Sequence, residues 1–246
     1  MNFQKETVKF LCVLFTLLVC QVEMKGQYVE WYTTIGGTKR QICRGISQTN
    51  DGGYIIKGET TSFDGDFEKN HGYYDFFAAK LDKNGKKEWI KTYGGSEFDQ
   101  MSSGYGLDKR YNTNIILDKG YILGGSSGSS NSDFSQNNGL ADICAIRVDQ
   151  FGNKLWARNF GGSGHEFCAG SFSTSSKETY LFGTSNSNDG DFAQGANNRN
   201  ISVIKIDSMG KKIWAKKFGG DIENEPRGSL YSKDNNIYLL GVIYKN

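Results

Sequence analysis

The sequence predicts an all-β fold, specifically a β-propeller of four-stranded blades. The first observation is a unit that recurs as LDKNGKKEWIKTYGG, VDQFGNKLWARNFGG and IDSMGKKIWAKKFGG, with a shorter copy, VEWYTTIGG. The second is a composition of 32 glycines, one proline and 13% aromatic residues, which is typical of many tight turns between aromatic-rich strands. The third is a predicted strand in each repeat that is apolar on both faces, as expected when a blade packs between two neighbours.

The tryptophans all lie in the recurring unit, and their spacing defines the repeat. Trp31, Trp89, Trp156 and Trp214 are separated by 58, 67 and 58 residues. A period of this order indicates a solenoid or a propeller. The middle repeat is longer than its neighbours, and we place the extra residues in or near residues 107–114.

Each period divides into four predicted strands. In the first repeat these are residues 40–48, 54–60, 75–81 and the tryptophan strand, which follows the turn Asp82-Lys83-Asn84-Gly85. Aspartate opening and glycine closing such a turn favour a hairpin, because glycine adopts positive φ without steric cost. The equivalent second strands are predicted at residues 121–126, 179–185 and 237–244, and the equivalent third strands at 142–148 and 200–206.

The third strand of each repeat favours a propeller over an open sheet. Residues 143–148, ICAIRV, are mostly apolar on both alternating faces, whereas a sheet with one face in water would alternate cleanly. Strands buried on both faces are expected when four-stranded blades stack against one another. No segment has the sustained period of an amphipathic helix.

The repeats predict one domain over residues 27–246 with about four blades. Three complete repeats cover residues 38–95, 96–162 and 163–220. The remaining pieces, residues 27–37 and 221–246, would join into a composite fourth blade that closes the ring, although this blade has no third strand. The alternative is that the chain is a truncated part of a larger propeller.

The N-terminus has the features of an export signal. Lys5 and Lys9 precede an apolar run at residues 10–20, which is too short to span a bilayer comfortably. We expect cleavage after Gly26, so that residues 1–26 are a signal peptide. The mature protein is then secreted or held at the cell surface.

Lipoprotein processing at Cys20 is the alternative route to the surface. Val19 is bulkier than the residue that usually precedes a lipidated cysteine, which favours cleavage at the later site. We predict no membrane span in the mature chain. The formal net charge of +2 gives no broad basic surface, so nucleic acid is not an expected partner.

The number and positions of the cysteines predict buried free thiols rather than disulfide bonds. Outside the signal the chain has Cys43, Cys144 and Cys168, and an odd number argues against a full disulfide framework. Cys43 and Cys168 take the same place in two repeats, and Met101 takes that place in the repeat between them. We therefore expect a buried apolar site, where a free thiol behaves as a small hydrophobe.

The run DGGYIIKGETTSFDGDF and the following YYDFFAAKLDKNGKKEWIKTYGG resemble a family of exported bacterial β-propeller repeat proteins. Members of this family are often secreted or cell-surface proteins, and most have no assigned activity. The resemblance covers nearly the whole mature chain. It implies the fold and the export route, and it brings no catalytic residues to carry over.

A weaker resemblance is to quinoprotein propellers. Their tryptophan-docking repeat places a glycine a short distance before a tryptophan, as Gly85 and Trp89 are placed here. The turn is shorter than in that pattern, and the chain is too short for the full ring of those enzymes. We therefore expect no quinone cofactor.

Two acidic loop motifs are the candidate metal site. Asp64-Gly65-Asp66 and Asp189-Gly190-Asp191 recur in the first and third repeats, and Asp75 lies shortly beyond the first. Calcium takes several carboxylate and carbonyl oxygens on a bent backbone, which such loops can supply. The alternative, which we favour, is that these aspartates form Asx-turns and cap backbone amides. No cofactor other than calcium is expected.

His165 and Glu166 are the candidate ligand-binding residues. His165 differs from the residues at the same place in the other repeats, Arg40, Phe98 and Glu223. A position that varies between repeats is freer of the shared structural role. A solvated loop histidine is the alternative, since no spacing resembles a metalloprotease helix or a nucleophile elbow.

These observations favour a non-catalytic exported scaffold that binds a protein or a glycan through loops on one face. The alternative is a secreted polysaccharide-active hydrolase or lyase on the same fold. Such an enzyme needs at least two carboxylates around one cleft, whereas the recurring aspartates are spread evenly along the repeats. The recurring tryptophans are expected to pack structurally rather than to stack on sugars.

Overall fold

The structure is a computed structural model that describes residues 30–102, 114–116, 120–193, 198–232 and 236–243. The chain divides into two units, Met1–Thr33 and Thr34–Asn246. Of the first unit, only residues 30–33 are described, and they lie outside any helix or strand. All the strands that the structure describes belong to the second unit.

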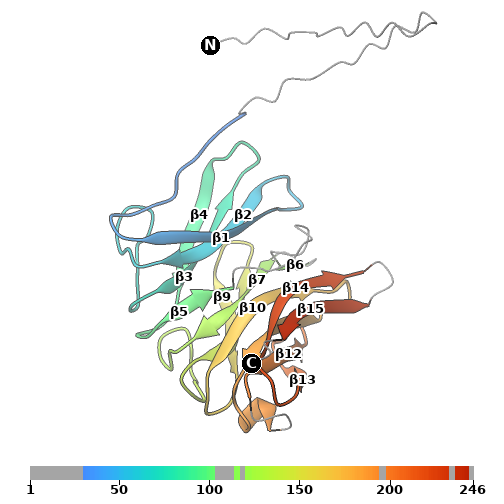
Figure 1. Cartoon of the computed structure of the whole chain (residues 1–246). Helices are drawn as coiled ribbons and strands as arrows, with labels where there is room; N and C mark the ends of the chain where they lie inside the picture. The colour runs from blue at the N-terminus through green and yellow to red at the C-terminus, as the bar shows by residue number, and fades with distance from the viewer. Residues whose placement is uncertain (1–29, 103–113, 117–119, 194–197, 233–235, 244–246) are drawn as a thin grey trace, which may run out of the picture. The chain divides into compact units, whose positions relative to one another are not determined.

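The second unit is all-β, as predicted, and its strands follow one another through antiparallel sheets (Figure 1). The first sheet has the order β1 (Gln41–Gln48), β2 (Tyr54–Thr60), β3 (Asp75–Leu81), β4 (Lys87–Tyr93). The third has the order β10 (Glu166–Ser173), β11 (Thr179–Ser185), β12 (Asn200–Ile206), β13 (Lys212–Phe218). Among the described residues the only helix is the short 3-10 turn η2 (Gly190–Phe192).

The second sheet has the same order, but its first strand is interrupted. It contains β5 (Asp99–Met101), β6 (Asn114–Ile116), β7 (Gly120–Ser127), β8 (Asp142–Asp149) and β9 (Lys154–Phe160). Both β5 and β6 pair with β7, so together they take the place of β1 and β10. A fourth, two-stranded sheet pairs β14 (Asn224–Tyr231) with β15 (Ile237–Ile243).

The predicted turn before the tryptophan strand forms as expected. In the first sheet, Gly85 N donates to the carbonyl of Asp82 at 3.1 Å, and Asp82 Oδ1 accepts from Asn84 N at 2.8 Å. Gly85 has a φ of 79°, a conformation in which a side chain would be strained. The bounds of β2, β3, β11 and β12 match the sequence prediction.

The tryptophan strand expected at residues 29–37 is not formed, and that prediction was wrong. The described residues 30–37 contain no strand. Each tryptophan strand of the three large sheets pairs with the third strand of its own sheet, as β4 does with β3. The shorter N-terminal copy of the repeat has no third strand beside it in the sequence, and an unpaired strand leaves its backbone hydrogen bonds unmade.

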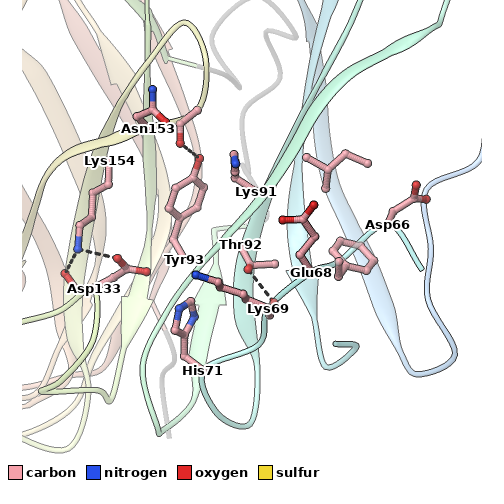
Figure 2. A pocket seen from close by; sticks show the side chains of 13 residues that line it. Asp66, Glu68, Lys69, His71, Lys91, Thr92, Tyr93, Asp133, Asn153 and Lys154 are labelled. Carbon is pink, nitrogen blue, oxygen red and sulfur yellow. Dashed lines mark hydrogen bonds and ion pairs between the residues drawn. The ribbon is translucent and has the colours of Figure 1, made fainter. Parts of the chain in front are cut away.

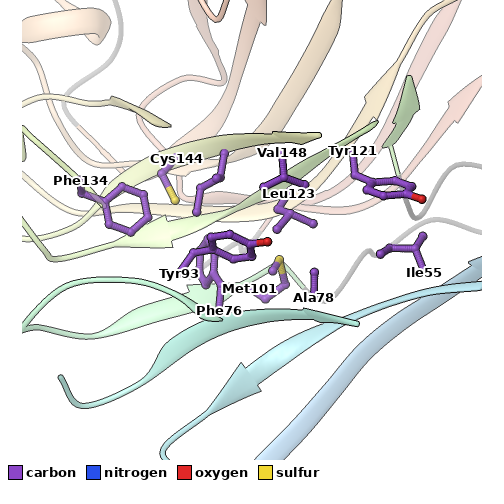
Figure 3. Packing of buried hydrophobic residues seen from close by; sticks show 11 residues of the cluster. Ile55, Phe76, Ala78, Tyr93, Met101, Tyr121, Leu123, Phe134, Cys144 and Val148 are labelled. Atoms are coloured by element: carbon purple, nitrogen blue, oxygen red, sulfur yellow. The ribbon is translucent and has the colours of Figure 1, made fainter. Parts of the chain in front are cut away.

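Neighbouring sheets bury a shared core between their faces. Ile55 and Phe76 of the first sheet pack with Met101, Leu123 and Cys144 of the second in one buried cluster (Figure 3). Every residue of β3 is buried. The expectation that third strands are buried on both faces is therefore confirmed for β3 and β8, whereas β12 is partly exposed on one face, at Ile201 and Lys205.

The tryptophans join one sheet to the turn of the next. Trp89 Nε1 donates to the carbonyl of Gln150 at 2.9 Å, in the hairpin turn of the second sheet. A β-carbon added to Gly152 of that turn would lie 2.8 Å from the Trp89 ring, and Gly152 has a φ of +80°. Trp156 packs in the same way on Gly210, where an added β-carbon would lie 2.9 Å from its ring.

The repeated cysteine position is buried in two repeats and exposed in one. Met101 and Cys168 are each about 1% exposed, as expected. Cys43 is exposed, so the prediction was wrong there. Met101 and Cys168 pack in clusters that include residues of the preceding sheet, whereas Cys43 lies on β1, in the first sheet.

Candidate functional site

The first acidic loop binds the Gly-Gly turn that precedes the first sheet. Gly36 N donates to Asp66 Oδ2 at 2.8 Å, and Asp66 N donates back to the carbonyl of Gly36 at 3.0 Å. Thr38 N donates to Asp64 Oδ1 at 2.8 Å. Both aspartates therefore act as caps for backbone amides, the role that turn chemistry gives them.

The same bonds join each later sheet to the one before it. In the second repeat, Asp133 accepts from Gly94 N at 3.0 Å and Asn131 accepts from Ser96 N at 2.9 Å. In the third repeat, Asp191 accepts from Gly161 N at 2.9 Å and Asp189 accepts from Ser163 N at 2.7 Å. The loop of one sheet is thus fastened to the end of the outer strand of the preceding sheet.

The second acid of each loop also meets a lysine of its own repeat. These ion pairs are Asp66 with Lys87, Asp133 with Lys154 and Asp191 with Lys212. The Oδ1 to Nζ distance is 2.6 Å in the first two pairs. The oxygens that calcium would need are therefore occupied by ammonium and amide groups.

The first acid of the two acidic loops, Asp64 and Asp189, is stabilised in its charged form by donors that follow the Gly-Gly pair. Hydrogen bonds from Thr38 hold the pKa of Asp64 below its ordinary value, and a hydrogen bond from the amide of Ser163 does the same to the pKa of Asp189. In the described parts of the chain, no three His, Cys, Asp or Glu side chains come together as a metal site requires. Calcium binding by these loops, the less favoured reading of the sequence, is disfavoured by this bonding pattern.

Asp75 lies apart from the loop aspartates, at the buried junction of the first two sheets. It begins β3, is 0% exposed, and accepts from His71 N at 2.7 Å through Oδ2. A β-carbon added to Gly94 would lie 2.4 Å from Asp75 Oδ1 and 2.9 Å from Asp99 Oδ2. Two buried carboxylates therefore face each other across Gly94.

The next junction repeats this acid pair with a longer side chain. Asp142 and Glu166 are both 0% exposed. A β-carbon added to Gly161 would lie 2.3 Å from Asp142 Oδ1 and 2.3 Å from Glu166 Oε2. Glu166 accepts from Gly162 N at 3.0 Å and from the hydroxyl of Ser185 at 2.7 Å.

The third junction has amides at both positions. Asn224 Nδ2 donates to Asn200 Oδ1 at 2.7 Å. An added β-carbon on Gly219 would lie 1.9 Å from Asn200 Oδ1, so the pair occupies the place of the two acid pairs. At this junction a neutral amide pair therefore takes the positions that the carboxylate pairs take at the first two junctions.

Burial raises the pKa of at least one acid in each pair. Desolvation raises the pKa of Asp99 to about 6, and desolvation together with the charge of Glu166 raises the pKa of Asp142 to about 6. Among the described residues, the buried Oδ1 atoms of Asp75 and Asp142 accept no hydrogen bond from a neighbour. A proton shared with the facing carboxylate would satisfy each of them.

A polar groove of about 320 Å³ lies where the first and second sheets meet (Figure 2). Lys69, His71 and Lys91 line it from the first sheet, and Asp133 and Lys154 line it from the second. Asp133 and Lys154 are paired with each other, as the dashed lines in Figure 2 show. Asp66 and Glu68 also line the groove, so it carries charges of both signs. Asp66 and Asp133 are each paired with a lysine.

The two predicted ligand-binding residues have different environments. His165 is exposed, and its amide donates to Asn186 Oδ1 at 2.6 Å. Glu166 is fully buried, and its carboxylate takes part in the junction described above. The structure therefore leaves His165 accessible and removes Glu166 from direct contact with a ligand.

An aromatic trio with two exposed members, Tyr73 and Phe98, occupies the place of His165 at the preceding junction. Tyr73 is 66% exposed and Phe98 is 40% exposed, and both lie against Tyr74, which is buried. The ring centroids are 5.1 Å apart for Tyr73 and Tyr74, and 5.2 Å apart for Tyr74 and Phe98. Arg40 Nη1 donates to the Tyr74 hydroxyl at 3.2 Å.

The trio and its equivalents share one backbone frame. Tyr74 and Phe98 form a parallel bridge, and so do Ala141 and His165 at the next junction. At the third junction Asn224 N donates to the carbonyl of Arg199 at 3.0 Å. The backbone contact is the same at all three junctions, but the side chains on it differ. The first junction presents aromatic rings, the second presents Leu140 and His165, and the third presents charged residues.

These positions lie at one end of the sheets. In an antiparallel sheet of consecutive strands, the connection from the second to the third strand and the connection to the next sheet leave from the same end. Sequence reasoning missed Tyr73 and Phe98 as surface residues because aromatic residues near strands are expected in the core. Aligning the repeats could have found them, because Tyr73 and Phe98 align with Leu140 and His165, and the residue type at both positions varies between repeats.

Comparison with profiles of known protein families gave no match, and comparison with curated proteins gave none either. Within the described residues, no helix is long and apolar enough to cross a membrane.

Proposed function

We propose that this chain is a non-catalytic exported or cell-surface β-propeller scaffold that binds a protein or a glycan through the loops at one end of its sheets. The proposed ring has about four blades. β14 and β15 would supply the first half of the fourth blade. The repeat pattern of the sequence and the resemblance to exported bacterial β-propeller repeat proteins support this architecture.

The exposed aromatic trio is the observation that supports a binding role. Large apolar side chains clustered on loops indicate a contact surface, because an isolated soluble domain gains by covering them. Phe98 forms a backbone bridge with Tyr74, and the Tyr73 ring packs on the Tyr74 ring, so both exposed rings are positioned for stacking on a sugar or an apolar side chain. Rigid sheets that present variable loops are a common arrangement for recognition.

The acidic residues favour this scaffold over the alternative, a secreted polysaccharide-active hydrolase or lyase. A glycosidase needs two carboxylates that both reach the substrate. The acid pair Asp142 and Glu166 is buried, and Asp66 and Asp191 are paired with lysines. The bonding of these groups supports a structural role for them.

A binding screen tests the proposal. The mature chain is applied to glycan and protein arrays beside the double variant Tyr73→Ala, Phe98→Ala and the control Phe151→Ala, which removes a 62% exposed aromatic from a hairpin turn. We expect at least one ligand class to be retained by the control and lost by the double variant. Equal binding by all three proteins, or turnover of a polysaccharide by the mature chain, would overturn the proposal.

Export is tested separately by the mass of the secreted protein. We expect a mature N-terminus at Gln27, the residue after Gly26. A lipid-modified N-terminus at Cys20 would instead establish the lipoprotein route.

A further inference from the structure

The groove between the first and second sheets contains two lysines that no acid of the described chain neutralises. Lys69 and Lys91 both line the groove and are both exposed. Among the described residues neither forms an ion pair, whereas Lys154, on the opposite wall, is paired with Asp133 at 2.6 Å. The ammonium groups of Lys69 and Lys91 are therefore available to a ligand.

The fold positions both of these lysines. A β-carbon added to Gly152, in the hairpin turn of the second sheet, would lie 2.9 Å from Lys91 Cγ, so the stem of Lys91 packs on that turn. Thr92 Oγ1 donates to the carbonyl of Lys69 at 2.7 Å, which ties the backbone of Lys69 to β4. Positioned side chains lose less conformational entropy when a ligand binds.

His71 is the third basic group of the groove, and a buried carboxylate orients its ring. Its Nδ1 lies 2.7 Å from Asp75 Oδ2, and its amide donates to the same oxygen at 2.7 Å. The side chain of His71 is 26% exposed and that of Asp75 is 0% exposed. Because Nδ1 is engaged by Asp75, Nε2 is the ring nitrogen left for a ligand. When both ring nitrogens carry a proton, Asp75 balances the charge and Nε2 is a donor.

The next junction shows that the fold does not require these basic groups. The residues that align with Lys69, His71 and Lys91 are Gln136, Asn138 and Arg158. Asn138 makes the same bonds to the buried acid of its own sheet, since its amide and its Nδ2 donate to Asp142 Oδ2 at 2.8 Å and 2.9 Å. An asparagine is therefore sufficient for the structural contact, and His71 and Lys69 add positive charge that this contact does not need.

We propose that this groove binds the anionic group of an acidic glycan, a sulfate ester or a uronate carboxylate, between Lys69, His71 and Lys91. The inference rests on the proposed function, because it names the class of ligand for the same loops. Lysine binds an anion as a point charge and does not demand the planar geometry that arginine matches, so either anion fits. The volume of about 320 Å³ is near the lower end of the range for small-molecule sites, which suits one end of a saccharide.

The other side chains of the groove favour a saccharide over an acidic peptide or a nucleic acid. Glu68 lines the groove, is exposed, and pairs with no cation of the described chain. In Figure 2 it lies on the side of Asp66, while Lys69 and His71 lie on the side of Tyr93. A carboxylate accepts hydrogen bonds from sugar hydroxyls and repels a polymer that is charged along its whole length.

The exposed tyrosine beside the groove supplies the apolar part of a sugar site. Tyr73 follows His71 by two residues in the same loop and is 66% exposed. Aromatic rings stack on the apolar faces of sugars, and binding sites for sugars combine such a ring with a few polar groups. The loop that carries His71 therefore presents both kinds of contact.

Calorimetric titration of the mature chain tests the inference. The probes are a sulfated disaccharide, a uronate-containing disaccharide and a neutral disaccharide, all at low salt. We expect an acidic probe to bind at least about tenfold more tightly than the neutral one, and to weaken as salt is added. Lys69→Gln combined with Lys91→Gln should lower the affinity for the acidic probe at least about tenfold.

Two further variants separate the groove from general effects of charge and folding. Lys83→Gln combined with Lys86→Gln removes the same charge from the exposed hairpin turn of the first sheet and should leave the affinity unchanged. His71→Asn should bind the acidic probe more weakly and keep the melting temperature, because an asparagine makes the equivalent bond in the next repeat.

Chemical labelling gives a second readout that does not depend on affinity. The mature chain is treated with an amine-acetylating reagent with and without the acidic disaccharide, and the labelled lysines are identified by mass spectrometry. We expect the disaccharide to protect Lys69 and Lys91 and to leave Lys83 and Lys86 labelled.

Four outcomes would overturn the inference. They are absence of binding by both acidic probes, binding that Lys69→Gln with Lys91→Gln leaves unchanged, an equal loss in the hairpin control, and tighter binding of a poly-glutamate peptide than of either saccharide. The last would assign the groove to an acidic protein.

The failure of this inference and the failure of the proposed function are distinguishable. A ligand that is lost in the double variant Tyr73→Ala, Phe98→Ala but is indifferent to the two lysines would remove the inference and leave the proposed function in place. An acidic disaccharide that needs the lysines and not the aromatic rings would support the groove and remove the binding role of the trio.

Discussion

The junction between the second and third large sheets and the junction between the third sheet and β14–β15 use the same positions with different chemistry. Asp142 faces Glu166 in the first, and Asn200 faces Asn224 in the second. In both, the two side chains enclose a glycine at the end of an outer strand. The amide pair is joined by a hydrogen bond of 2.7 Å.

The difference indicates what the carboxylates do. An amide has a donor and an acceptor, so an amide pair can make the hydrogen bond without a proton from solvent. A carboxylate pair can make that bond only if one of the two is protonated, which fits the raised pKa of Asp142. We therefore interpret the buried acids as structural contacts that hold neighbouring sheets together, and not as catalytic groups.

Loss of a tryptophan that packs on the next sheet has the largest expected effect. Trp156→Ala should lower the free energy of unfolding by about 3 kcal/mol, the low end for a large aromatic, because the ring is half-buried. Trp214→Ala should cost roughly 1–2 kcal/mol, because its described ring partner is Tyr180 of its own sheet. Urea denaturation of the mature chain measures both. Equal losses would show that docking on the following turn contributes nothing.

Asp142→Asn should change how stability depends on pH. Burial raises the pKa of Asp142 from 3.8 to about 6, so the folded state holds its proton more tightly than the unfolded state. Its contribution is full below about pH 4 and is lost as the pH rises through about 6. Asp142→Asn should therefore be nearly neutral at pH 4 and should stabilise the protein by about 2–3 kcal/mol at pH 7.

Asn200→Asp is the matched reverse change at the amide junction. It should create a buried acid opposite Asn224 and so destabilise the protein at pH 7 more than at pH 4. Guanidinium denaturation at both pH values gives the comparison. If neither variant differs from the parent in its pH dependence, the carboxylate pair does not share a proton.

Asp66→Ala should have a smaller effect, because its ion pair is partly exposed. It removes the bond from Gly36 N and the contact with Lys87, and we expect a loss of about 1–2 kcal/mol. Asp66→Asn keeps an acceptor for Gly36 N and should lose less. Thermal unfolding of the two variants at low salt provides the measurement, and a greater loss for the asparagine variant would contradict this reading.

The parts of the fold governed by local chemistry were predictable from the sequence. The Asp82 to Gly85 turn and the apolar third strands fixed the strands of the large sheets, because turn type and periodicity are properties of short segments. The N-terminal strand and the burial of Cys43 were predicted wrongly, because both depend on a partner strand or sheet far away in the chain. The acid pairs could not be predicted either, since the sequence does not indicate which acidic side chains face each other across a glycine.

The most direct test of the structural role of the acids is thermal unfolding with and without calcium. If Asp64, Asp66, Asp189 and Asp191 cap amides and pair with lysines, millimolar calcium should leave the melting temperature of the mature chain unchanged, and Asp66→Ala should lower it equally in both conditions. A calcium site saturated at about 100 times its dissociation constant would instead add about 2.7 kcal/mol. A reproducible calcium-dependent rise that disappears in Asp66→Ala would contradict the account.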